Sequence, residues 1–462
     1  ENSYLKLPQL FYSNTKAEKF PNLEVVSKNI KLISALNLEN NNFNNFIIKS
    51  INDKNIKSFS QSYAGHQFGH FTVLGDGRAT LLGEHLNLNS ERYDIQLKGS
   101  GKTPYSRNGD GKGTLKSMLR EFIISEAMHN LNIKTTRSLA VLKTGEKIMR
   151  TGFEQGGILV RVAKSHIRVG TFQLAQISNK NENTKELLDY SIERLYPELK
   201  NNKNKYLDFY KKVVESQINL ILEWQRVGFI HGVMNTDNMS ILGLTIDYGP
   251  FSFMETYNPA FICNHSDSQG RYSFERQPSV ALWNLERLAD AMRSLVDKDD
   301  LKDALSVYQF SLVKEYSLLM RQKFGLLKVL DEDSTLINDF LQLLYTNKRD
   351  YHRSMRRLSD QKEQSMGGEF DSWFERYHKR IKQEIEKPEQ RIRLMNSVNP
   401  KYVLRNYLAE VAIRKAEDLN QYDEIETLFN LLRSPFESHK GFDLYDSEAP
   451  EWAQNLELSC SS

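Results

Sequence analysis

Four polar side chains lie close together near the middle of the chain: His231, Asp237, Asn238 and Asp247. Carboxylate and amide oxygens are hard ligands of the kind that Mg²⁺ and Mn²⁺ prefer. An Asp-Asn pair is common in turns, but this pair follows a long helical pattern at 207–227 and a His-Gly, and Asp-Tyr-Gly-Pro-Phe comes soon after it. The order indicates a loop that handles a metal ion and phosphate.

The same spacing is similar to the catalytic loop and metal-binding Asp of protein kinases. In kinases the Asp of His-Arg-Asp accepts the proton of the substrate hydroxyl, and an Asn five residues later holds a metal. Val233 stands at the acidic position of this chain, and valine cannot accept a proton. Asn238 and Asp247 keep their ligand oxygens. We therefore expect a kinase-like protein whose reaction is not standard phosphorylation.

Cationic side chains that could bind phosphate precede this loop. Lys98 ends an alternating strand pattern at 93–98, and Glu121 lies in a helical pattern at 115–131. In a kinase-like lobe such a lysine binds phosphate oxygens, and the helix glutamate holds it through an ion pair. Strand-end lysines are common, so the order before the His231 loop is what favours this function. Arg161 and Arg168 either stabilise a triphosphate or pair with carboxylates, and the sequence leaves both open.

Glycine-rich segments offer weaker signals. Gly75-Asp-Gly-Arg78 is a hairpin turn in which backbone N–H groups and the arginine could also reach phosphate. Residues 99–103, Gly-Ser-Gly-Lys-Thr, are not a Walker P-loop, because Gln96 stands where that pattern requires glycine. His66 and His70 have the spacing of a helical metal pair, but the glycines around them make packing the better interpretation.

The elements that must position these groups fall into two halves. Residues 59–172 carry strand patterns at 71–82 (two strands joined by an Asp-Gly turn), 93–98, 139–142 and 157–163, with a loop at 99–113 and the helix at 115–131. Helical patterns dominate afterwards, at 207–227, 283–296, 301–319, 337–345, 371–385 and 402–417. The prediction is an α+β, protein-kinase-like bilobal fold, with a β-rich N-lobe, a helical C-lobe and extra C-terminal helices.

This division predicts four segments. Residues 1–58 form an N-terminal extension that packs on the lobes, 59–175 the N-lobe, 176–300 the C-lobe with the catalytic loop and an activation-like segment, and 301–462 a helical region with a mobile cysteine-containing tail. Charged residues make up 26% of the chain, but the net charge is only +3, which argues against a nucleic-acid partner. No apolar run reaches the roughly 20 residues of a membrane span. Two cysteines are typical of a reducing compartment.

The chain resembles the selenoprotein O (SelO) family of atypical pseudokinases over essentially its full length. The matching segments are residues 63–69, 74–78, 96–107, 109–111, 159–168, 231–241, 247–251 and 458–462. The resemblance implies transfer of AMP from ATP to Ser, Thr or Tyr hydroxyls of proteins, redox proteins among them, with release of pyrophosphate. It also implies a nucleotide that is flipped relative to a kinase. The location would be the cytoplasm in a bacterium and the mitochondrion in a eukaryote.

The resemblance also implies roles for residues. Asp237 would accept the proton, and Asn238 and Asp247 would hold Mg²⁺ or Mn²⁺. The nucleotide site would comprise Gly75, Gly77, Arg78, Lys98, Asp110, Gly111, Arg161, Arg168 and Asp247, with Glu121 positioning Lys98. With the nucleotide flipped, the reacting phosphorus lies elsewhere than in a kinase, which accounts for the valine in the loop. Phosphate transfer depends mainly on positioning and charge.

Two further questions stay open at this level. Cys263 lies in the activation-like segment and Cys460 in the tail, where some relatives carry selenocysteine; a reversible disulfide between them would lock that segment, and two unrelated thiols are the alternative. The alternative functions are UMP transfer, a protein or small-molecule kinase, and an inactive nucleotide-binding scaffold. A small-molecule kinase predicts an aspartate at Val233, and retained Lys98, Asn238 and Asp247 argue against a scaffold.

Overall fold

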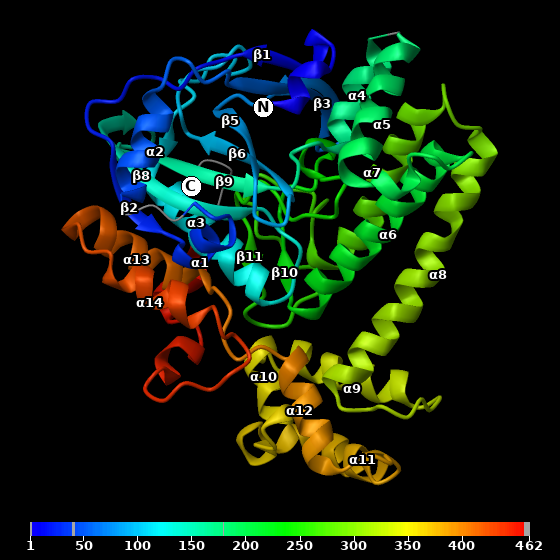
Figure 1. Cartoon of the computed structure of the whole chain (residues 1–462). Helices are drawn as coiled ribbons and strands as arrows, with labels where there is room; N and C mark the ends of the chain where they lie inside the picture. Colours follow the sequence, from blue (N-terminus) through cyan, green and yellow to red (C-terminus); the bar gives the residue numbers. More distant parts are fainter. Residues whose placement is uncertain (1, 39–41, 179, 457–462) are drawn as a thin grey trace.

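The computed structural model describes residues 2–38, 42–178 and 180–456. It is a mixed α+β protein, in which an N-terminal antiparallel sheet is followed by a largely helical region (Figure 1). The α+β class predicted from the sequence is confirmed at this level. Within the described residues, no helix is long and apolar enough to cross a membrane.

The sheet has nine strands in the order β1-β3-β5-β6-β9-β8-β2, with β4 paired to β3 and β7 paired to β9. Every pairing is antiparallel. The strands are β1 (Tyr12–Asn14), β2 (Glu24–Lys28), β3 (Phe59–Gln67), β4 (His70–Gly75), β5 (Ala79–Leu86), β6 (Arg92–Lys98), β7 (Gly113–Thr114), β8 (Arg137–Met149) and β9 (Phe153–Ala163). Residues 2–58 thus supply two strands of this sheet, and the four-segment division of the chain stays a prediction.

Helix α3 (Leu115–Asn130) carries the glutamate that was expected to face the sheet. The Thr114 hydroxyl caps its first turn by accepting a hydrogen bond from Ser117 N at 3.1 Å. Leu115, Met118 and Phe122 are buried at helical spacing, which fixes the helix against β8 and β9. The helix predicted at 115–131 is confirmed to within one residue.

The rest of the chain is largely helical. The helices before the catalytic-loop region are α1 (Ile30–Ala35), α2 (Phe43–Asn52), α4 (Val169–Ile177), α5 (Asn181–Leu195) and α6 (Lys205–Arg226). A small sheet of β10 (Phe229–Ile230) and β11 (Ser252–Phe253) brackets the His231–Asp247 loops. The later helices are α7 (Gln277–Met292), α8 (Lys298–Lys323), α9 (Asp333–Thr346), α10 (Tyr351–Ser359), α11 (Asp371–Ile381), α12 (Pro388–Val398), α13 (Asn406–Leu419) and α14 (Asp423–Leu431).

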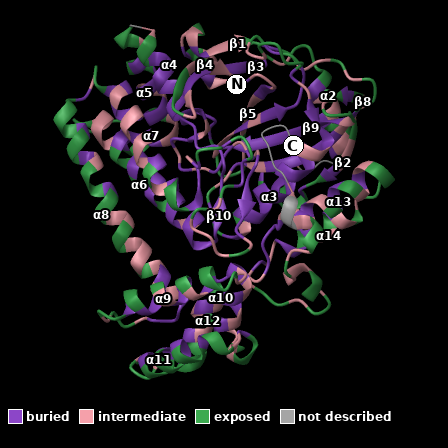
Figure 2. Cartoon of the chain, turned by 180° about the vertical axis from the view of Figure 1, so that it is seen from behind, coloured by how far each residue is buried: buried purple, intermediate pink, exposed green. Residues whose placement is uncertain are grey.

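The last six of these helices, α9 to α14, separate into two groups (Figures 1 and 2). Helices α9 to α12 share a core around Trp373 and Phe340 with the end of α8. Helices α13 and α14 return to the sheet and pack against α3, with the Phe122 and Phe429 rings stacked 4.5 Å apart. The C-terminal helices therefore support the same helix that carries Glu121.

One prediction needs a correction. Residues 71–82 do form two strands, β4 and β5, but they do not pair with each other as a hairpin; both pair with β3. The physical reason lies in β3, where Ser60 and Gln61 are buried and engage the turn between the other two strands. The polar sequence of β3, like the short strands β1 and β2, gave no clear alternation, so these strands were not predicted individually.

Candidate active site

A cavity of about 860 Å³ opens between the β3–β6 part of the sheet and the loops after α6. Of the residues predicted for the site, nine line it: Gly77, Arg78, Lys98, Asp110, Gly111, Arg161, Asp237, Asn238 and Asp247. Gly75, Glu121 and Arg168 are not part of the lining and support it from behind. The fold thus brings together distant segments of the chain, as in the bond from the His66 backbone N–H to Thr236 Oγ1, 170 residues apart.

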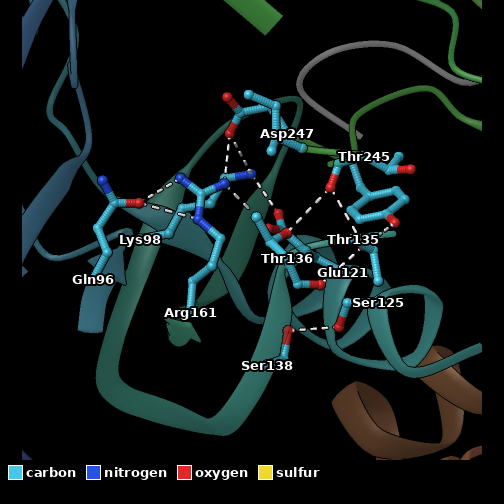
Figure 3. Close-up of polar contacts among 12 residues, drawn as sticks. Gln96, Lys98, Glu121, Ser125, Thr135, Thr136, Ser138, Arg161, Thr245 and Asp247 are labelled. Carbon is cyan, nitrogen blue, oxygen red and sulfur yellow. Dashed lines mark hydrogen bonds and ion pairs between the residues drawn. The ribbon is translucent and has the colours of Figure 1, made fainter. Parts of the chain in front are cut away.

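Lys98 lies at the centre of a buried charge network (Figure 3). Its ammonium group pairs with Glu121 and lies 3.8 Å from Asp247 Oδ1. Arg161 Nη1 reaches Asp247 Oδ1 at 2.6 Å and Glu121 Oε1 at 3.4 Å. Burial lowers the pKa of Lys98, while the two carboxylates raise it in part. The strand-end lysine and helix glutamate expected from the sequence do form an ion pair.

Arg168 completes this network from the N-cap of α4. Its Nη1 donates to Asp247 Oδ2 at 2.8 Å and to the Asp237 carbonyl at 2.7 Å, and its guanidinium lies over the Tyr63 ring at 4.4 Å. Nη2 is buried and has no hydrogen-bond partner among the described residues. A buried guanidinium with a donor to spare is suited to an anionic ligand. Both arginines therefore pair with Asp247, and Arg168 keeps one unused donor.

Asp247 accepts hydrogen bonds from Arg161 and Arg168, forms an ion pair with Lys98, and has an unusual backbone conformation. Its φ of +56° lies in the left-handed region that non-glycine residues rarely occupy. Burial tends to raise the pKa of its carboxyl, but Arg161, Arg168 and Lys98 hold that pKa well below its usual range. Asp247 is thus ionised at neutral pH. With Glu121 it offsets two of the three cations, which leaves the cluster attractive to anions.

Asp237 has the opposite electrostatic character. It lies in a short 3₁₀ turn (Thr236–Asn238) and is only 6% exposed. Burial raises the pKa of its carboxyl to about 6, with Arg168 acting against this change. Its Oδ1 is buried and has no hydrogen-bond partner among the residues described. A carboxylate of this kind can accept a proton near neutral pH.

The carboxylate of Asp237 fits directly over β3. A Cβ atom at Gly65 would lie 2.2 Å from Asp237 Oδ1, so any larger residue there would displace the side chain. The loop is held from the other side by Asn238, whose Nδ2 donates to the Val233 carbonyl at 3.0 Å. This bond turns the Asn238 amide oxygen away from Val233 and leaves it available as a ligand.

A three-way junction closes the site and was not predicted from the sequence. Asn235 Oδ1 accepts from the Tyr272 hydroxyl at 2.6 Å and from Phe68 N at 3.1 Å. The Phe68 and Tyr272 rings lie 5.2 Å apart. The tip of the β3–β4 hairpin, the loop before Asp237 and the segment after Asp247 are therefore fastened at one point.

Other residues that the sequence did not single out also shape the cavity. Gln96 Oε1 accepts from Arg161 Nε at 3.0 Å, and its Nε2 donates to Asp76 Oδ2 at 3.1 Å. Arg150 forms two hydrogen bonds to Asp110, which lower the pKa of that carboxyl. The alternation in β6 could have indicated Gln96, because it shares a face with Lys98.

The structure assigns His231 a structural place. Its ring is buried, donates a hydrogen bond from Nε2 to the Ile246 carbonyl at 2.7 Å and packs against Trp224 at 5.4 Å. It ties the Asp237 loop to the segment that precedes Asp247. His66 and His70 lie on β3 and β4 rather than on a helix; the His66 ring packs against Phe71 and Trp283.

The described residues offer few ligands for the predicted metal ion. In the described ranges, no cluster of three His, Cys, Asp or Glu side chains is arranged for a metal ion. Mg²⁺ commonly takes only one or two protein oxygens together with substrate phosphates, and Asp247 and the Asn238 amide fit that role.

Cys263 is buried beside Gly232. Cys460, its predicted partner, lies outside the described residues.

Comparison with known proteins gives a consistent result. The family model described as "Protein adenylyltransferase SelO" matches residues 1–433. A "Protein nucleotidyltransferase YdiU" from Thiobacillus denitrificans is 42% identical over 480 aligned residues, covering 100% of this chain and 98% of the relative. The protein of the same name from Pectobacterium carotovorum is 45% identical and covers 88% of this chain and 86% of its own length. That from Lachnoclostridium phytofermentans is 42% identical over 100% of the chain and 99% of the relative.

Proposed function

The chain belongs to the SelO protein adenylyltransferase family, and from that premise we propose that it transfers AMP from ATP to hydroxyl groups of proteins within the 860 Å³ cavity. The protein is thus a nucleotidyltransferase that acts on proteins. The observation that carries the proposal is the contrast between Val233 and Asp237, which line the same cavity. A kinase base would stand at the valine, whereas the carboxylate able to take a proton near pH 6 lies elsewhere.

We further propose that the architecture is the bilobal fold of protein kinases. Three features support this proposal: the strand-end Lys98 pairs with Glu121 of the crossing helix α3, the His231 loop follows a long helix, and Asp247 lies opposite both. Helices α9 to α14 would then be additions to the helical lobe. The proposal concerns arrangement only, because a fold does not determine a reaction.

The triphosphate of a flipped ATP would lie against the cationic group of the cavity. Lys98, Arg161 and Arg168 outnumber the two carboxylates among them, and Arg78 lines the same cavity. Such preorganised donors stabilise charge on the departing pyrophosphate in a partly dehydrated site. Arg168 lies behind the lining and would act indirectly, by holding the Asp247 carboxylate in place. Gly77 and Gly111 line the cavity and permit close approach of the backbone to phosphate.

A divalent cation, Mg²⁺ or Mn²⁺, would be held by Asp247 and the Asn238 amide oxygen together with phosphate oxygens. When bound, such an ion neutralises phosphate charge and orients the α-phosphate. Side chains of the protein hold the groups around this ion in position. Arg161 and Arg168 keep Asp247 ionised and fix the direction of its carboxylate. Glu121 holds Lys98 in place.

Asp237 would act as the proton acceptor. A hydroxyl oxygen of the substrate attacks the α-phosphorus, the bond from that phosphorus to the β-bridging oxygen breaks, and pyrophosphate leaves. The hydroxyl proton passes to the Asp237 carboxylate and from there to solvent. Because transfer of this type depends mainly on positioning and charge, the contribution of the base should be modest beside that of the cations.

Product analysis tests this proposal. The protein is incubated with unlabelled ATP, Mg²⁺ or Mn²⁺ and an acceptor protein such as casein, and the nucleotide products are separated by chromatography. Adenylyl transfer yields pyrophosphate and an acceptor heavier by one AMP, and Asp237→Asn should slow both equally. ADP together with a phosphorylated acceptor would mean that the chain is a kinase. Repeating the incubation with UTP decides whether UMP is also transferred.

A further inference from the structure

A second cavity, of about 290 Å³, lies between β2, α3 and α14. These three elements come from the beginning, the first third and the end of the chain, and both views show them side by side (Figures 1 and 2). It shares no lining residue with the proposed active site. Its volume is close to the lower end of the roughly 300–1,000 Å³ typical of small-molecule pockets.

One part of this cavity is apolar. The apolar lining residues are Val25, Val26, Ile30, Phe122, Ile425 and Phe429. Phe122 and Phe429 are stacked nearly parallel, with 10° between the ring planes. The two rings are nearly fully buried, and the Arg433 guanidinium lies 4.7 Å from the centre of the Phe429 ring, so an apolar ligand body would meet mainly the aliphatic side chains and the ring edges.

The polar part carries unused hydrogen-bonding capacity. Ser27 is 7% exposed, and its Oγ is buried without a hydrogen-bond partner among the described residues. The same holds for Nε of Arg433. Buried polar atoms are nearly always satisfied in folded proteins, so two such atoms lining one cavity indicate a missing acceptor.

The charge on Arg433 is also incompletely balanced. The Oε1 atom of Glu126 lies 3.8 Å from Arg433 Nε, too far for a hydrogen bond, while Glu126 Oε2 accepts two hydrogen bonds from Arg137 and one from Asn29. Burial lowers the pKa of Arg433. The other polar contacts of its guanidinium are to the neutral amides of Asn29 (3.0 Å) and Asn430 (3.3 Å).

We propose that this cavity is a binding site for a small organic carboxylate, with an apolar body against Phe122 and Phe429 and the carboxylate on Arg433 and Ser27. A carboxylate accepts in the plane that a guanidinium presents. Glu426 lines the same cavity, and its negative charge disfavours a second negative charge on the ligand. Lys28 also lines the cavity and is hydrogen-bonded to Asn44 at 3.3 Å. The preferred ligand is therefore a monoanion.

The position of the cavity gives such a ligand a route to the active site. Phe122 follows Glu121 on α3, and Glu121 pairs with Lys98. A ligand packed on Phe122 contacts the helix that sets this ion pair, so its binding and that of ATP should be coupled. Coupling of this kind is reciprocal. This consequence rests on the proposed function, while binding of the carboxylate does not.

Isothermal titration of the nucleotide-free protein with phenylacetate tests binding directly. We expect a dissociation constant of about 1 mM or lower, which corresponds to a binding free energy of about −4 kcal/mol or more favourable. The neutral analogue phenylacetamide is the ligand control and should bind at least about 10-fold more weakly. Arg433→Gln should weaken phenylacetate binding by about 10- to 100-fold, as loss of a hydrogen bond to a charged group implies.

Two further variants guard against a folding artefact. Ser27→Ala keeps the size of the cavity and should weaken phenylacetate modestly, whereas Ser27→Leu fills the cavity and should abolish binding, with both variants unfolding at temperatures near that of the native protein. Absence of binding up to about 10 mM would overturn the proposal. Equal affinity for phenylacetate in the native protein, Ser27→Leu and Arg433→Gln would also overturn the proposal.

The coupling is measured separately by titrating ATP with and without saturating phenylacetate. The two ligands should change each other's dissociation constant by the same factor. If no acceptor is ever adenylylated but phenylacetate still binds through Arg433, the function proposed above fails and the site stands. If transfer occurs and phenylacetate does not bind, only the site is wrong.

Discussion

Replacing Asp237 with asparagine removes a buried negative charge and keeps the shape of the side chain. The carboxyl pKa of Asp237 is raised by burial from its ordinary 3.8 to about 6. Because the unfolded chain releases this proton first, the native protein loses stability as pH rises from about 4 to about 6, and the loss stays complete above that range. At about 1.4 kcal/mol per pH unit, the loss is about 3 kcal/mol at pH 8 and about 1 kcal/mol at pH 4.5.

Urea unfolding at these two pH values, followed by tryptophan fluorescence, measures this loss. Asp237→Asn should be more stable than the native protein, by about 2 kcal/mol more at pH 8 than at pH 4.5, while its transferase activity falls. Asp110→Asn is a matched control in the same cavity. Since Arg150 lowers the pKa of the Asp110 carboxyl, that substitution should change stability in the opposite direction with pH, and only slightly because the side chain is 44% exposed. If the difference in unfolding free energy between Asp237→Asn and the native protein were equal at both pH values, the raised pKa of the Asp237 carboxyl would be refuted.

Three other substitutions or treatments give independent predictions. Gly65→Ala should displace the Asp237 carboxylate, which would lie 2.2 Å from the new methyl group, and abolish transfer while ATP binding measured by titration persists; full activity would contradict this placement. Tyr272→Phe removes one hydrogen bond of the three-way junction and should lower kcat up to about tenfold with little change in KM for ATP, whereas a change in KM alone would assign the junction to binding. Peptide mapping without reductant should find a disulfide joining Cys263 to Cys460 in the oxidised protein, and alkylation of both thiols there would remove the proposed lock.

The parts of the fold that follow a strong local pattern could be predicted from the sequence. Helix α3 was predicted to within one residue, because its apolar spacing is a local signal. Strand β6 was predicted from its alternation, and Lys98 from its place at the end of that strand. The order of Lys98 and Glu121 before the His231 loop supported the prediction that they form an ion pair, whereas the contact of Lys98 with Asp247 was not predicted.

Contacts that depend on distant segments could not be predicted in this way. The β3 strand buries Ser60 and Gln61, whose hydroxyl and backbone N–H bond to Ala79 and Asp76, so neither alternation nor hydrophobicity marks it. The junction at Asn235 joins atoms 37 and 167 residues away along the chain. The sequence left open whether Arg168 binds phosphate or a carboxylate, and only the fold shows that the N-cap of α4 places it against Asp247.

The central claim is that the α-phosphorus of ATP, and not the γ-phosphorus, is transferred to protein. Parallel incubations with Mg²⁺ or Mn²⁺ and ATP labelled on the α- or γ-phosphate test it most directly. The account predicts label on protein only from α-labelled ATP, and its loss in Asp247→Ala, which removes the carboxylate that Lys98, Arg161 and Arg168 hold. Label on protein only from γ-labelled ATP would contradict the account and make this chain a kinase despite Val233.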